Sequence, residues 1–358
     1  MRRSIDERVP VTAILKRHSN HAAVSGYDQI IDHLECYPIW QSKPSGYLMR
    51  LLVWLMERLL PKSGSQWYGK RSLAAELQAA MRWLGRSGQV FHFYYGENSF
   101  RYLGLLKRLR NNTIVCTYHT PPQRFAEVVL DQEHLKLIDL VIVVSRASSP
   151  VFEKVLGKDK VVFIPHGVDV DFFRPLSSDH DCGRFRCLFV GSHLRDFELL
   201  AALASRALHA MPDVSFEVVT LEQDFHHFTG LPNVRLHSGV SDSALRSLYQ
   251  NCDLLLMPLK DATANNSILE ALACGMPILV TDLPGVRDYV NEDMAVFTPP
   301  GDLQAMEQSL ERLRSDATHR REMAHAARLQ AERFSFARIA DLTQKAYSQV
   351  QYAPFSGQ

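Results

Sequence analysis

The stretch from Leu254 to Thr281 changes character three times, and this alternation limits the folds that the chain can adopt. Leu254–Leu259 is an apolar run of strand length, and the polar sequence Thr-Ala-Asn-Asn-Ser follows it as a loop. Ile268–Cys274 has the pattern of a short helix that a Gly-Met-Pro sequence ends, and Pro277–Thr281 is a second apolar run. A strand, a loop, a helix and a strand in this order predict the βαβ unit of a parallel sheet.

Strands and helices of similar length alternate through both halves of the sequence. In the first half, strand-length apolar runs occupy Val9–Lys16, Val90–Tyr95, Thr113–Tyr118, Leu140–Ser145 and Val161–Pro165. Helical patterns lie between them, at Tyr27–Glu35, Arg71–Leu84, Phe100–Leu109 and Ala147–Val155. In the second half, further strands are expected at Arg186–Val190, Ser215–Thr220, Val234–His237 and Ala295–Phe297, and helices at Asp196–His209, Asp242–Asn251, Val286–Asn291 and Asp302–Arg314. Two such series predict an α/β fold with two doubly wound domains, whose ligands bind at the carboxyl ends of the strands.

Length and composition agree with two folded domains. The chain has 358 residues, 46% of them apolar, which is enough for two separate cores. A polar segment, Pro175–Gly183, lies between the two series of strands and helices. We therefore expect one domain over residues 1–170 and a second over residues 171–337. The apolar spacing of Glu332–Tyr352 predicts a last helix.

The charge balance and the cysteines restrict the classes of partner and compartment. The 40 Lys and Arg residues are balanced by 39 Asp and Glu residues, so the basic excess of a nucleic-acid-binding protein is missing. The six cysteines form no Cys-x-x-Cys pair, and the first residues lack the apolar core of a secretory signal. We expect a cytoplasmic protein without a disulfide framework or a zinc site.

Gly46–Leu60, with the sequence GYLMRLLVWLMERLL, is the longest apolar stretch. Three charged residues interrupt it, namely Arg50, Glu57 and Arg58. It is too short and too charged to span a bilayer, and on a helix the three charges form one narrow polar wedge. The pattern favours a helix packed inside a domain. The alternative is a peripheral contact with a membrane, which would point to a lipid acceptor.

The loop before the Ile268 helix carries the first candidate site. Ser267 and Glu270 have the S-x-x-E spacing of a capping box, in which each side chain binds a backbone amide at the helix start. The same helix start offers amides to an anionic group such as phosphate. Glu270, one turn along, would then accept hydrogen bonds from the two hydroxyls of a ribose, and the amides of Asn265 and Asn266 would bind hydroxyls. Both interpretations stay open.

Longer motifs indicate a family. Asn266–Pro277, with the sequence NSILEALACGMP, resembles the donor-binding helix of the GT-B glycosyltransferases of family four, which are retaining enzymes that use nucleotide sugars. The resemblance extends over Val141–Asp171, over the CLFVGSHLRD stretch and through FTPPGDL. It implies two Rossmann-like domains that face each other across a cleft, the first for the acceptor and the second for the nucleotide sugar. It also implies that the last helix, about residues 338–358, packs back on the first domain.

The resemblance implies roles for individual residues. Glu270 would hold the ribose of the nucleotide, and the amides around Ser267 and Ile268 would hold the distal phosphate. His119, in the loop after the Thr113–Tyr118 strand, matches the histidine that contacts the transferred sugar from the first domain. The alternative for His119 is a loop histidine without such a role.

Two glycine turns carry further expected contacts. Ser25 and Gly26 match the turn after the first strand, where the backbone can approach the diphosphate or the acceptor. Gly191 matches the glycine after the first strand of the second domain, but the arginine and lysine that usually follow it are missing. Arg195 is our candidate for the diphosphate clamp, and Lys260 is a second one. The alternative for Arg195 is a surface ion pair with the aspartate that follows it.

Ala262 is a further departure from the family pattern. Family members commonly carry a glutamate eight residues before the ribose ligand, facing the sugar, and Ala262 occupies that place. Asp261 is one candidate to replace it. The other is the Asn265–Asn266 pair, which would bind the sugar hydroxyls instead.

The resemblance and the loops together predict a retaining glycosyltransferase. It would move a sugar from a nucleotide sugar, such as a UDP- or GDP-sugar, to a hydroxyl of a glycan, a lipid-linked saccharide or a small-molecule glycoside. His119 and Arg195 would act in catalysis, since cations and amide dipoles stabilise a departing diphosphate. No D-x-D motif follows a strand, so we expect no metal and no other cofactor.

Two other functions stay open. A catalytically degenerate relative would bind a sugar nucleotide as a sensor or as a partner in a complex, which the two departures from the pattern favour. A nucleotide-sugar epimerase on the same fold would need a carboxylate and histidine set around the sugar.

Overall fold

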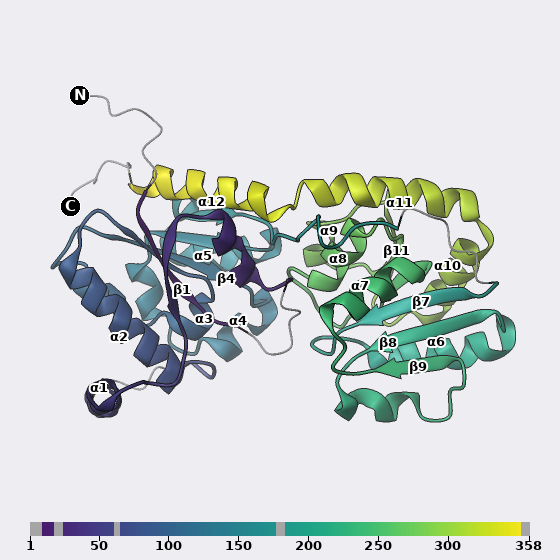
Figure 1. Ribbon diagram of the computed structural model, residues 1–358, viewed down its shortest axis with the longest axis horizontal. Coiled ribbons are helices and arrows are strands. Elements are labelled where there is room, and N and C mark those ends of the chain that lie inside the picture. Colours follow the sequence, from purple (N-terminus) through teal and green to yellow (C-terminus); the bar gives the residue numbers. More distant parts are fainter. Residues whose placement is uncertain (1–8, 18–23, 61–64, 177–182, 352–358) are drawn as a thin grey trace. The chain divides into compact units, whose positions relative to one another are not determined.

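The structure, a computed structural model, describes residues 9–17, 24–60, 65–176 and 183–351 (Figure 1). The chain forms two compact units. Among the described residues, unit 1 contains 9–17, 26–60, 65–165 and 336–351, and unit 2 contains 24–25, 166–176 and 183–335. Most of the polar segment Pro175–Gly183, and residues 352–358 of the expected last helix, lie outside the described residues.

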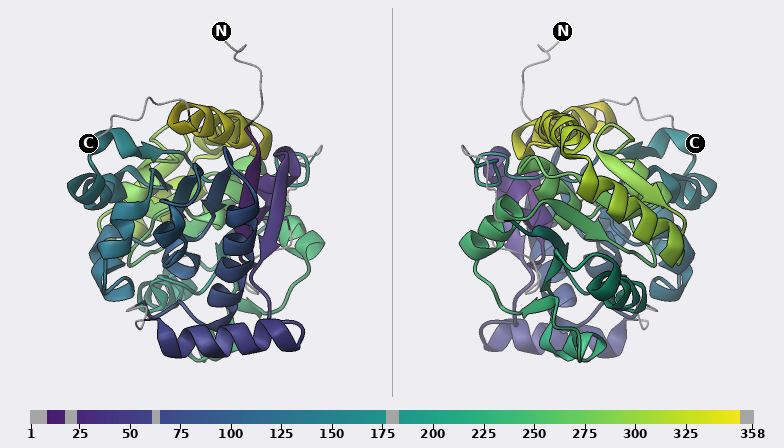
Figure 2. Two further views of the ribbon diagram at one scale, coloured as in Figure 1. Left: turned by 90° about the vertical axis from the view of Figure 1, so that its left-hand side faces the viewer. Right: turned by 90° about the vertical axis from the view of Figure 1, so that its right-hand side faces the viewer.

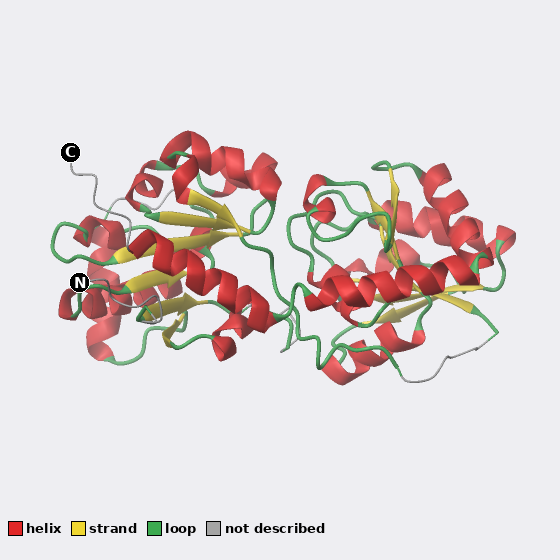
Figure 3. Cartoon of the chain, turned by 90° about the horizontal axis from the view of Figure 1, so that it is seen from above, coloured by secondary structure: helices red, strands yellow, loops and turns green. Residues whose placement is uncertain are grey.

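Unit 1 is built on a sheet of six parallel strands. They are β1 (Val11–Leu15), β2 (Cys36–Trp40), β3 (Val90–Phe93), β4 (Thr113–Tyr118), β5 (Leu140–Val143) and β6 (Val161–Phe163). The spatial order is β2-β1-β3-β4-β5-β6, and each neighbouring pair is parallel. Every residue of β1, β3 and β5 is buried, which is typical of parallel strands with helices on both faces (Figure 3).

The helices of unit 1 come from both ends of the chain. They are α1 (Tyr47–Leu59), α2 (Lys70–Gly85), α3 (Gly96–Ser99), α4 (Pro122–Val128), α5 (Ser149–Leu156) and α12 (Phe336–Gln351). Shorter 3₁₀ turns are η1 (Tyr27–His33), η2 (Leu103–Leu106), η3 (Glu133–Leu137), η4 (Arg146–Ser148) and η5 (Lys158–Lys160). After unit 2 is complete, α12 returns to unit 1 and packs on η1 and β4.

The predicted helix at Phe100–Leu109 is wrong. Only η2 forms in this segment, as a 3₁₀ turn. The reason is the buried Glu76 carboxylate of α2, which accepts the backbone N–H groups of Arg101, Tyr102 and Leu103 at 2.9, 2.6 and 2.7 Å. These amides bind a side chain from another element. They therefore do not form the backbone hydrogen bonds of the helix that the local sequence pattern predicts.

The helix predicted at Gly46–Leu60 forms as α1, but it is not packed inside the unit. Val53 is its only buried residue, and it packs with Met49, Met56 and Leu60 against α2. Six large apolar side chains on the other side of α1 are exposed: Tyr47, Leu48, Leu51, Trp54, Leu55 and Leu59. Figure 2 shows α1 at the edge of its unit. Within the described residues, no helix is long and apolar enough to cross a membrane.

Unit 2 contains a second sheet of six parallel strands. They are β7 (Phe185–Val190), β8 (Val214–Val219), β9 (Val234–His237), β10 (Leu254–Met257), β11 (Ile278–Thr281) and β12 (Ala295–Thr298). The order is β12-β11-β10-β7-β8-β9, with parallel pairing throughout. The chain builds one side of the sheet from β7 outward and then returns to β10. The strand order therefore reverses between β7 and β10, which confirms the predicted doubly wound α/β class.

Helices flank this second sheet. They are α6 (Phe197–Ala210), α7 (Asp242–Asn251), α8 (Asn266–Ala273), α9 (Pro284–Arg287), α10 (Leu303–Ser315) and α11 (Ala317–Glu332), with the 3₁₀ helix η6 (Glu222–Phe228). All residues of α8 after the first are buried, and α11 packs against it. We did not predict α11, because its buried face is a narrow stripe of Met323, Ala327 and Ala331 that leaves little apolar signal in the sequence.

Candidate functional site

The switch point of the unit 2 sheet brings together several of the residues predicted to bind a donor. β7 and β10 are hydrogen-bonded neighbours. The loop after β7 carries Gly191 and Arg195, and the loop after β10 leads to the start of α8. In doubly wound sheets, ligands bind in the crevice outside the carboxyl ends of the strands at this point.

Arg195 lies at the centre of this cluster. Its guanidinium donates hydrogen bonds to the carbonyls of Val190 and His193, at 3.0 and 3.1 Å. It also donates to Asn265 Oδ1 at 3.4 Å and to Ser267 Oγ at 3.3 Å. The arginine side chain therefore connects the end of β7 with the start of α8.

The alternative role for Arg195, an ion pair with the next residue, is wrong. The Asp196 carboxylate instead caps α6 by accepting the Leu199 N–H at 3.1 Å. Burial lowers the pKa of Arg195 to about 10, and the neighbouring Tyr249 and Glu270 oppose this shift. At neutral pH the guanidinium therefore keeps its positive charge.

Gly191 makes room for this arginine. Its φ is 103°, in the region that glycine favours, and a Cβ atom there would lie 2.6 Å from the Arg195 guanidinium. Leu194 has a φ of 59°, a left-handed conformation that costs a leucine strain energy. The turn between these residues folds the Arg195 side chain back on the end of β7.

Asn265 rather than Ser267 caps α8, so the predicted capping box is wrong. The Asn265 side chain is the N-cap and accepts the Ser267 N–H at 3.1 Å. Because this cap lies two residues earlier, Ser267 Oγ donates instead to the Val190 carbonyl at 3.3 Å. The Glu270 side chain has another partner, described below.

The amides predicted to hold a phosphate already have acceptors. Ser267 N–H binds the Asn265 side chain, and Ile268 N–H binds the Asn265 carbonyl at 3.1 Å. A phosphate that used the first amide would replace the Asn265 side chain there. Arg195, which contacts both Asn265 and Ser267, lies at the same place with the complementary charge.

Glu270 is buried, with an exposed fraction of 3%. The Tyr249 hydroxyl, from the last turn of α7, donates to Glu270 Oε2 at 2.7 Å. Burial raises the pKa of Glu270 to about 7, and the nearby hydroxyls of Ser25 and Tyr249 partly offset this effect. Sequence reasoning missed Tyr249, because its partner lies on another helix and no local pattern connects the two residues.

The remaining predicted donor residues behave differently from one another. Asn266 Nδ2 donates to the carbonyl of Ser25, a residue that groups with unit 2, at 2.9 Å. Asp261 Oδ1 accepts the amide of the following residue at 2.8 Å. The Lys260 ammonium extends to the surface and pairs with Glu198 of α6 at 2.9 Å. Asn266 therefore lies at the start of α8, whereas the side chains of Asp261 and Lys260 bind the other partners just named.

His119 of unit 1 lies in the loop after β4. Its ring stacks on Tyr95 with a centroid separation of 4.4 Å, and Tyr27 meets it edge-on at 4.9 Å. The buried Glu97 carboxylate accepts the His119 backbone N–H at 3.2 Å and lies 3.7 Å from Nδ1. Sequence reasoning missed Glu97. Its place directly after β3, at the carboxyl end of a strand, is the signal that would have found it.

Gly26 is the N-cap of η1. Its φ of −68° is open to any residue, but a Cβ atom here would collide with the Asp28 carboxylate. Asp28 in turn accepts a hydrogen bond from Arg17 Nε at 2.9 Å. Packing inside the turn therefore accounts for this glycine, and its approach to a diphosphate or an acceptor stays a prediction.

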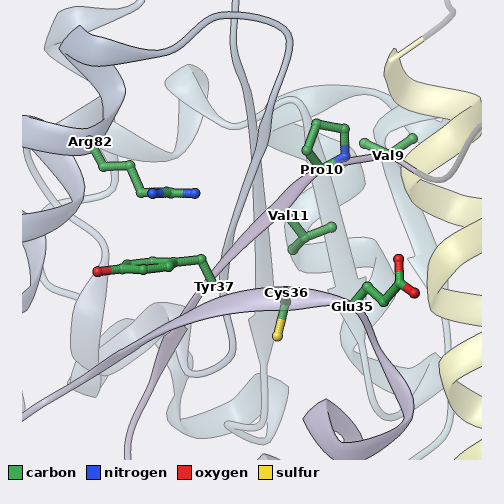
Figure 4. Close-up of a pocket in the computed structure, with 7 residues that line it drawn as sticks. All are labelled: Val9, Pro10, Val11, Glu35, Cys36, Tyr37 and Arg82. Atoms are coloured by element: carbon green, nitrogen blue, oxygen red, sulfur yellow. The ribbon is translucent and has the colours of Figure 1, made fainter.

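A pocket lies at the opposite edge of the unit 1 sheet (Figure 4). Its lining consists of Val9, Pro10, Val11, Glu35, Cys36, Tyr37 and Arg82. The Arg82 guanidinium lies over the Tyr37 ring, 4.0 Å from its centroid. Because Val11 begins β1 and Cys36 begins β2, the pocket is at the amino ends of these strands. Ligands of doubly wound sheets bind at the other ends, so we do not assign this pocket to the site.

Comparison with known proteins finds a family resemblance within the second unit. Residues 184–316 match the sequence model of the family described as Glycosyl transferases group 1. This region contains Gly191, Arg195 and Glu270. Over these residues the chain is similar to the group 1 glycosyl transferases.

Two curated relatives of this chain are glycosyltransferases. The D-inositol 3-phosphate glycosyltransferase of an Arthrobacter species is 26% identical, over 53% of this chain and 50% of the relative. The capsular polysaccharide biosynthesis glycosyltransferase CapM of Staphylococcus aureus is 30% identical, over 31% of this chain and 29% of the relative. The matched region thus spans half or less of the length of each of these relatives.

Solved structures share the fold of this chain over nearly its whole length. A sucrose-phosphate synthase from Thermosynechococcus elongatus is similar with a TM-score of 0.72 and 17% identity, over 96% of this chain and 99% of that one. HepE of Anabaena, in complex with UDP and glucose, has a TM-score of 0.70 and 14% identity, over 95% of this chain and all of that one. The two six-stranded parallel sheets are those of the GT-B fold, as predicted.

The described residues contain no cluster of three or more His, Cys, Asp or Glu side chains that could hold a metal ion.

Proposed function

We propose that this chain moves a sugar from a nucleoside-diphosphate sugar to a hydroxyl of an acceptor, with retention of the anomeric configuration. The observation that carries the proposal is the grouping of Arg195, Glu270 and the start of α8 at the switch point of the unit 2 sheet. The structural relative HepE, which was solved with UDP and glucose, supports a nucleotide-sugar donor. The curated relatives support glycosyl transfer as the reaction class.

Glu270 binds the ribose in this proposal. A carboxylate accepts hydrogen bonds only, and the two hydroxyls of a ribose donate them. Tyr249 already donates to one carboxyl oxygen at 2.7 Å and so fixes the orientation of the group. Because both side chains are buried, the hydrogen bonds form where water does not compete for them.

Arg195 and the start of α8 bind the diphosphate. The bond between the anomeric carbon and the diphosphate oxygen breaks in the transition state, so negative charge grows on the leaving group. The guanidinium and the amide dipoles of the helix start face this charge. The acceptor hydroxyl attacks from the same face and passes its proton to the departing diphosphate. No metal is needed in this route, and Lys260 is a second candidate for the diphosphate.

His119 in unit 1 contacts the transferred sugar, and Ser25 and Gly26 lie along the approach of the diphosphate or the acceptor. The place of the missing glutamate, Ala262, offers no polar side chain to the sugar. Asn265 and Asn266 take over the sugar hydroxyls, since both lie at the start of α8. Asp261 remains the other candidate for this role.

A screen of donors followed by turnover tests the proposal. Thermal unfolding with UDP-, GDP- and dTDP-sugars identifies the donor, and release of the nucleoside diphosphate, with and without acceptor sugars, measures the reaction. We expect Arg195→Ala to lower kcat by about a hundredfold or more, the scale of a lost donor to a developing negative charge. Arg206→Ala, which removes an exposed pair with Glu307, is the matched control and should react normally.

Two results would replace this proposal. Nucleotide binding without transfer or donor hydrolysis, across all donors, indicates the degenerate sensor or complex partner. Conversion of the donor into another nucleotide sugar, without release of the nucleotide, indicates an epimerase.

We further propose that the acceptor lies at a membrane and that α1 rests on the bilayer surface on its cytoplasmic side. The outward face of α1, defined above by its six exposed apolar residues, has no protein partner among the described residues. Arg50 and Arg58 of α1 and Arg71 of α2 are also exposed. Apolar residues that enter the headgroup region, with cations beside them, match an anionic bilayer. The described cysteines are all free, which agrees with a reducing compartment.

Vesicle sedimentation tests this contact. We expect the protein to bind phosphatidylglycerol vesicles and to bind phosphatidylcholine vesicles more weakly. Replacing Leu51 and Leu55 by glutamate should abolish binding to both kinds of vesicle. Leu105 and Leu109, which are 65% and 58% exposed in the same unit, give the matched control pair. Equal binding of both glutamate variants would exclude α1 as the contact surface. No binding of the unaltered chain would exclude the membrane.

A further inference from the structure

The unit 1 sheet has its own topological switch point, and three charged or titratable side chains surround it. β1 lies between β2 and β3, so the strand order reverses between β1 and β3. Lys16 follows β1, Glu97 lies in α3 after β3, and His119 follows the neighbouring strand β4. All three residues are therefore at the carboxyl edge of the sheet, where doubly wound folds bind ligands.

Glu97 is an unusual member of this group, because it is a carboxylate with almost no exposed surface. Its side chain is 2% exposed, and its Oε1 accepts the His119 backbone N–H at 3.2 Å. Oε2 is buried without a hydrogen-bond partner among the described residues. A buried carboxylate costs free energy unless charges or hydrogen bonds compensate it. Burial lowers the pKa of the half-buried Lys16, and the charge of Glu97 raises it again.

The backbone around Glu97 is tightly fixed. Gly96 packs so closely on the Tyr118 ring of β4 that a Cβ atom would lie 2.7 Å from it. The Glu97 carbonyl also accepts a hydrogen bond from Ser65 Oγ at 3.0 Å. The position of the carboxylate relative to β4, and so to the His119 loop, is therefore set by the fold.

The His119 ring has little freedom to turn away from this carboxylate. Tyr95 stacks on it with an interplanar angle of 27°, and Tyr27 meets it at 76°. The edge of the ring that carries Nδ1 faces Glu97 Oε1 at 3.7 Å, which is within ion-pair range and just beyond a hydrogen bond. Catalytic hydrogen bonds are often long in a free enzyme and shorten when substrate binds.

We propose that Glu97 is a positioning residue that acts through His119. Its carboxylate keeps the proton of the imidazole on Nδ1 and so leaves Nε2 as a hydrogen-bond acceptor. Nε2 then receives a hydroxyl of the transferred sugar. This inference rests on the proposed function, in which His119 contacts that sugar. Beyond the proposed function, it assigns the tautomer of His119 and names Glu97 as the group that selects this tautomer.

Nuclear magnetic resonance of the imidazole nitrogens tests the tautomer without any turnover. In the ¹⁵N-labelled chain we expect His119 to show the Nδ1–H form, and Glu97→Ala to show a mixture of both forms. The control is Glu76→Gln, because Glu76 is also a buried carboxylate of unit 1 but binds backbone amides of another segment. It should lower stability and leave the His119 signals as they are. An Nε2–H form in the unaltered chain overturns the inference, whether or not the chain transfers sugar.

A double-mutant cycle separates positioning from a purely structural role. Glu97→Gln keeps an oxygen for the His119 backbone N–H but removes the charge. We expect it to lower kcat about ten- to a hundredfold, with the donor KM nearly unchanged, because an imidazole in the wrong orientation or tautomer still leaves the nucleotide bound. In a His119→Ala background the same change should have no further effect. Equal losses in both backgrounds would show that Glu97 does not act through His119.

The two proposals fail in different ways. If no donor gives turnover, the proposed function falls, while the resonance experiment still decides the role of Glu97. If turnover is present and the cycle is additive, only the inference on Glu97 is overturned.

Discussion

Glu270 shows how the environment of one side chain changes its chemistry. The carboxyl group is buried, and the Tyr249 hydroxyl is its hydrogen-bond donor. The spacing to Ser267 in the sequence suggested a helix cap, whereas in the fold the Glu270 carboxylate accepts a hydrogen bond from Tyr249. The difference arises from Asn265, which caps the helix and leaves Glu270 without that function.

A pH dependence of stability follows from this burial. The carboxyl ionises near pH 4.5 in an unfolded chain but keeps its proton up to about pH 7 in unit 2. The protonated form therefore stabilises the fold, fully below pH 4.5, and this contribution is lost as the pH rises through 7. The shift corresponds to about 3 kcal/mol. We expect urea denaturation to show the unaltered chain losing stability between pH 4.5 and about 7 relative to Glu270→Gln.

Nucleotide affinity should follow the opposite trend. The ionised carboxylate accepts hydrogen bonds from both ribose hydroxyls, so the affinity for UDP should rise as the pH increases through 7. Calorimetry should show a flat profile for Glu270→Gln, and an affinity lower by about 1–3 kcal/mol for Glu270→Ala. If Glu270→Ala lowers only the melting temperature, the residue has a structural role alone.

At the scale of the element, α8 couples stability to the site through its cap. Asn265 Oδ1 accepts both the Ser267 N–H and a hydrogen bond from Arg195. We expect Asn265→Ala to lower the stability of unit 2 by about 1 kcal/mol, the usual cost of a lost N-cap, and also to weaken nucleotide binding. Thermal unfolding and calorimetry measure the two effects.

A second cap in the same unit provides the control. The Asp302 side chain caps α10 by accepting the Ala305 N–H at 2.9 Å. Asp302→Ala should cost similar stability and leave nucleotide affinity unchanged. A loss of affinity in both variants would mean that the effect comes from general destabilisation.

The elements also show what the sequence could predict. The strands Thr113–Tyr118 and Val234–His237 were predicted with their observed bounds, because their residue patterns depend on local composition. β2 was missed, because Cys-Tyr-Pro-Ile-Trp contains a proline and few buried positions. It pairs only with β1 at the sheet edge, where a proline is tolerated. The short η2 turn depends on Glu76 from another helix, and local patterns do not contain that information.

The same limit applies to the candidate site. Gly191, Arg195, Ser267 and Glu270 stand in loops after strands or at a helix start, and the sequence alone singled them out. Tyr249 was not predicted, because it acts through a contact between two helices.

At the scale of the whole molecule, unit 1 is assembled from separate parts of the chain. Tyr347 of α12 is buried, and its hydroxyl lies 2.6 Å from His92 Nδ1 and 3.3 Å from the Tyr94 hydroxyl. Burial lowers the pKa of His92 to about 3, so its ring is neutral and needs hydrogen-bond partners. The second ring nitrogen binds Thr117 Oγ1 at 2.7 Å.

Removing this hydroxyl should destabilise unit 1. Tyr347→Phe leaves a buried nitrogen of His92 unpaired, and we expect a loss of about 1–3 kcal/mol. All four tryptophans of the chain lie between Trp40 and Trp83, so intrinsic fluorescence follows the unfolding of unit 1. Lys345→Ala, an exposed change on the same helix, should stay within about 0.5 kcal/mol. Equal unfolding curves for Tyr347→Phe and the unaltered chain would show that the contact adds no stability.

The return of α12 also fixes an order of events during synthesis. A ribosome makes the sheet of unit 1 first, but it makes Tyr347 only after every residue of unit 2. The Tyr347 partner of His92 is therefore synthesised only after the whole of unit 2. The unit that is translated first is completed last, and unit 2 has all of its strands and helices before unit 1 does.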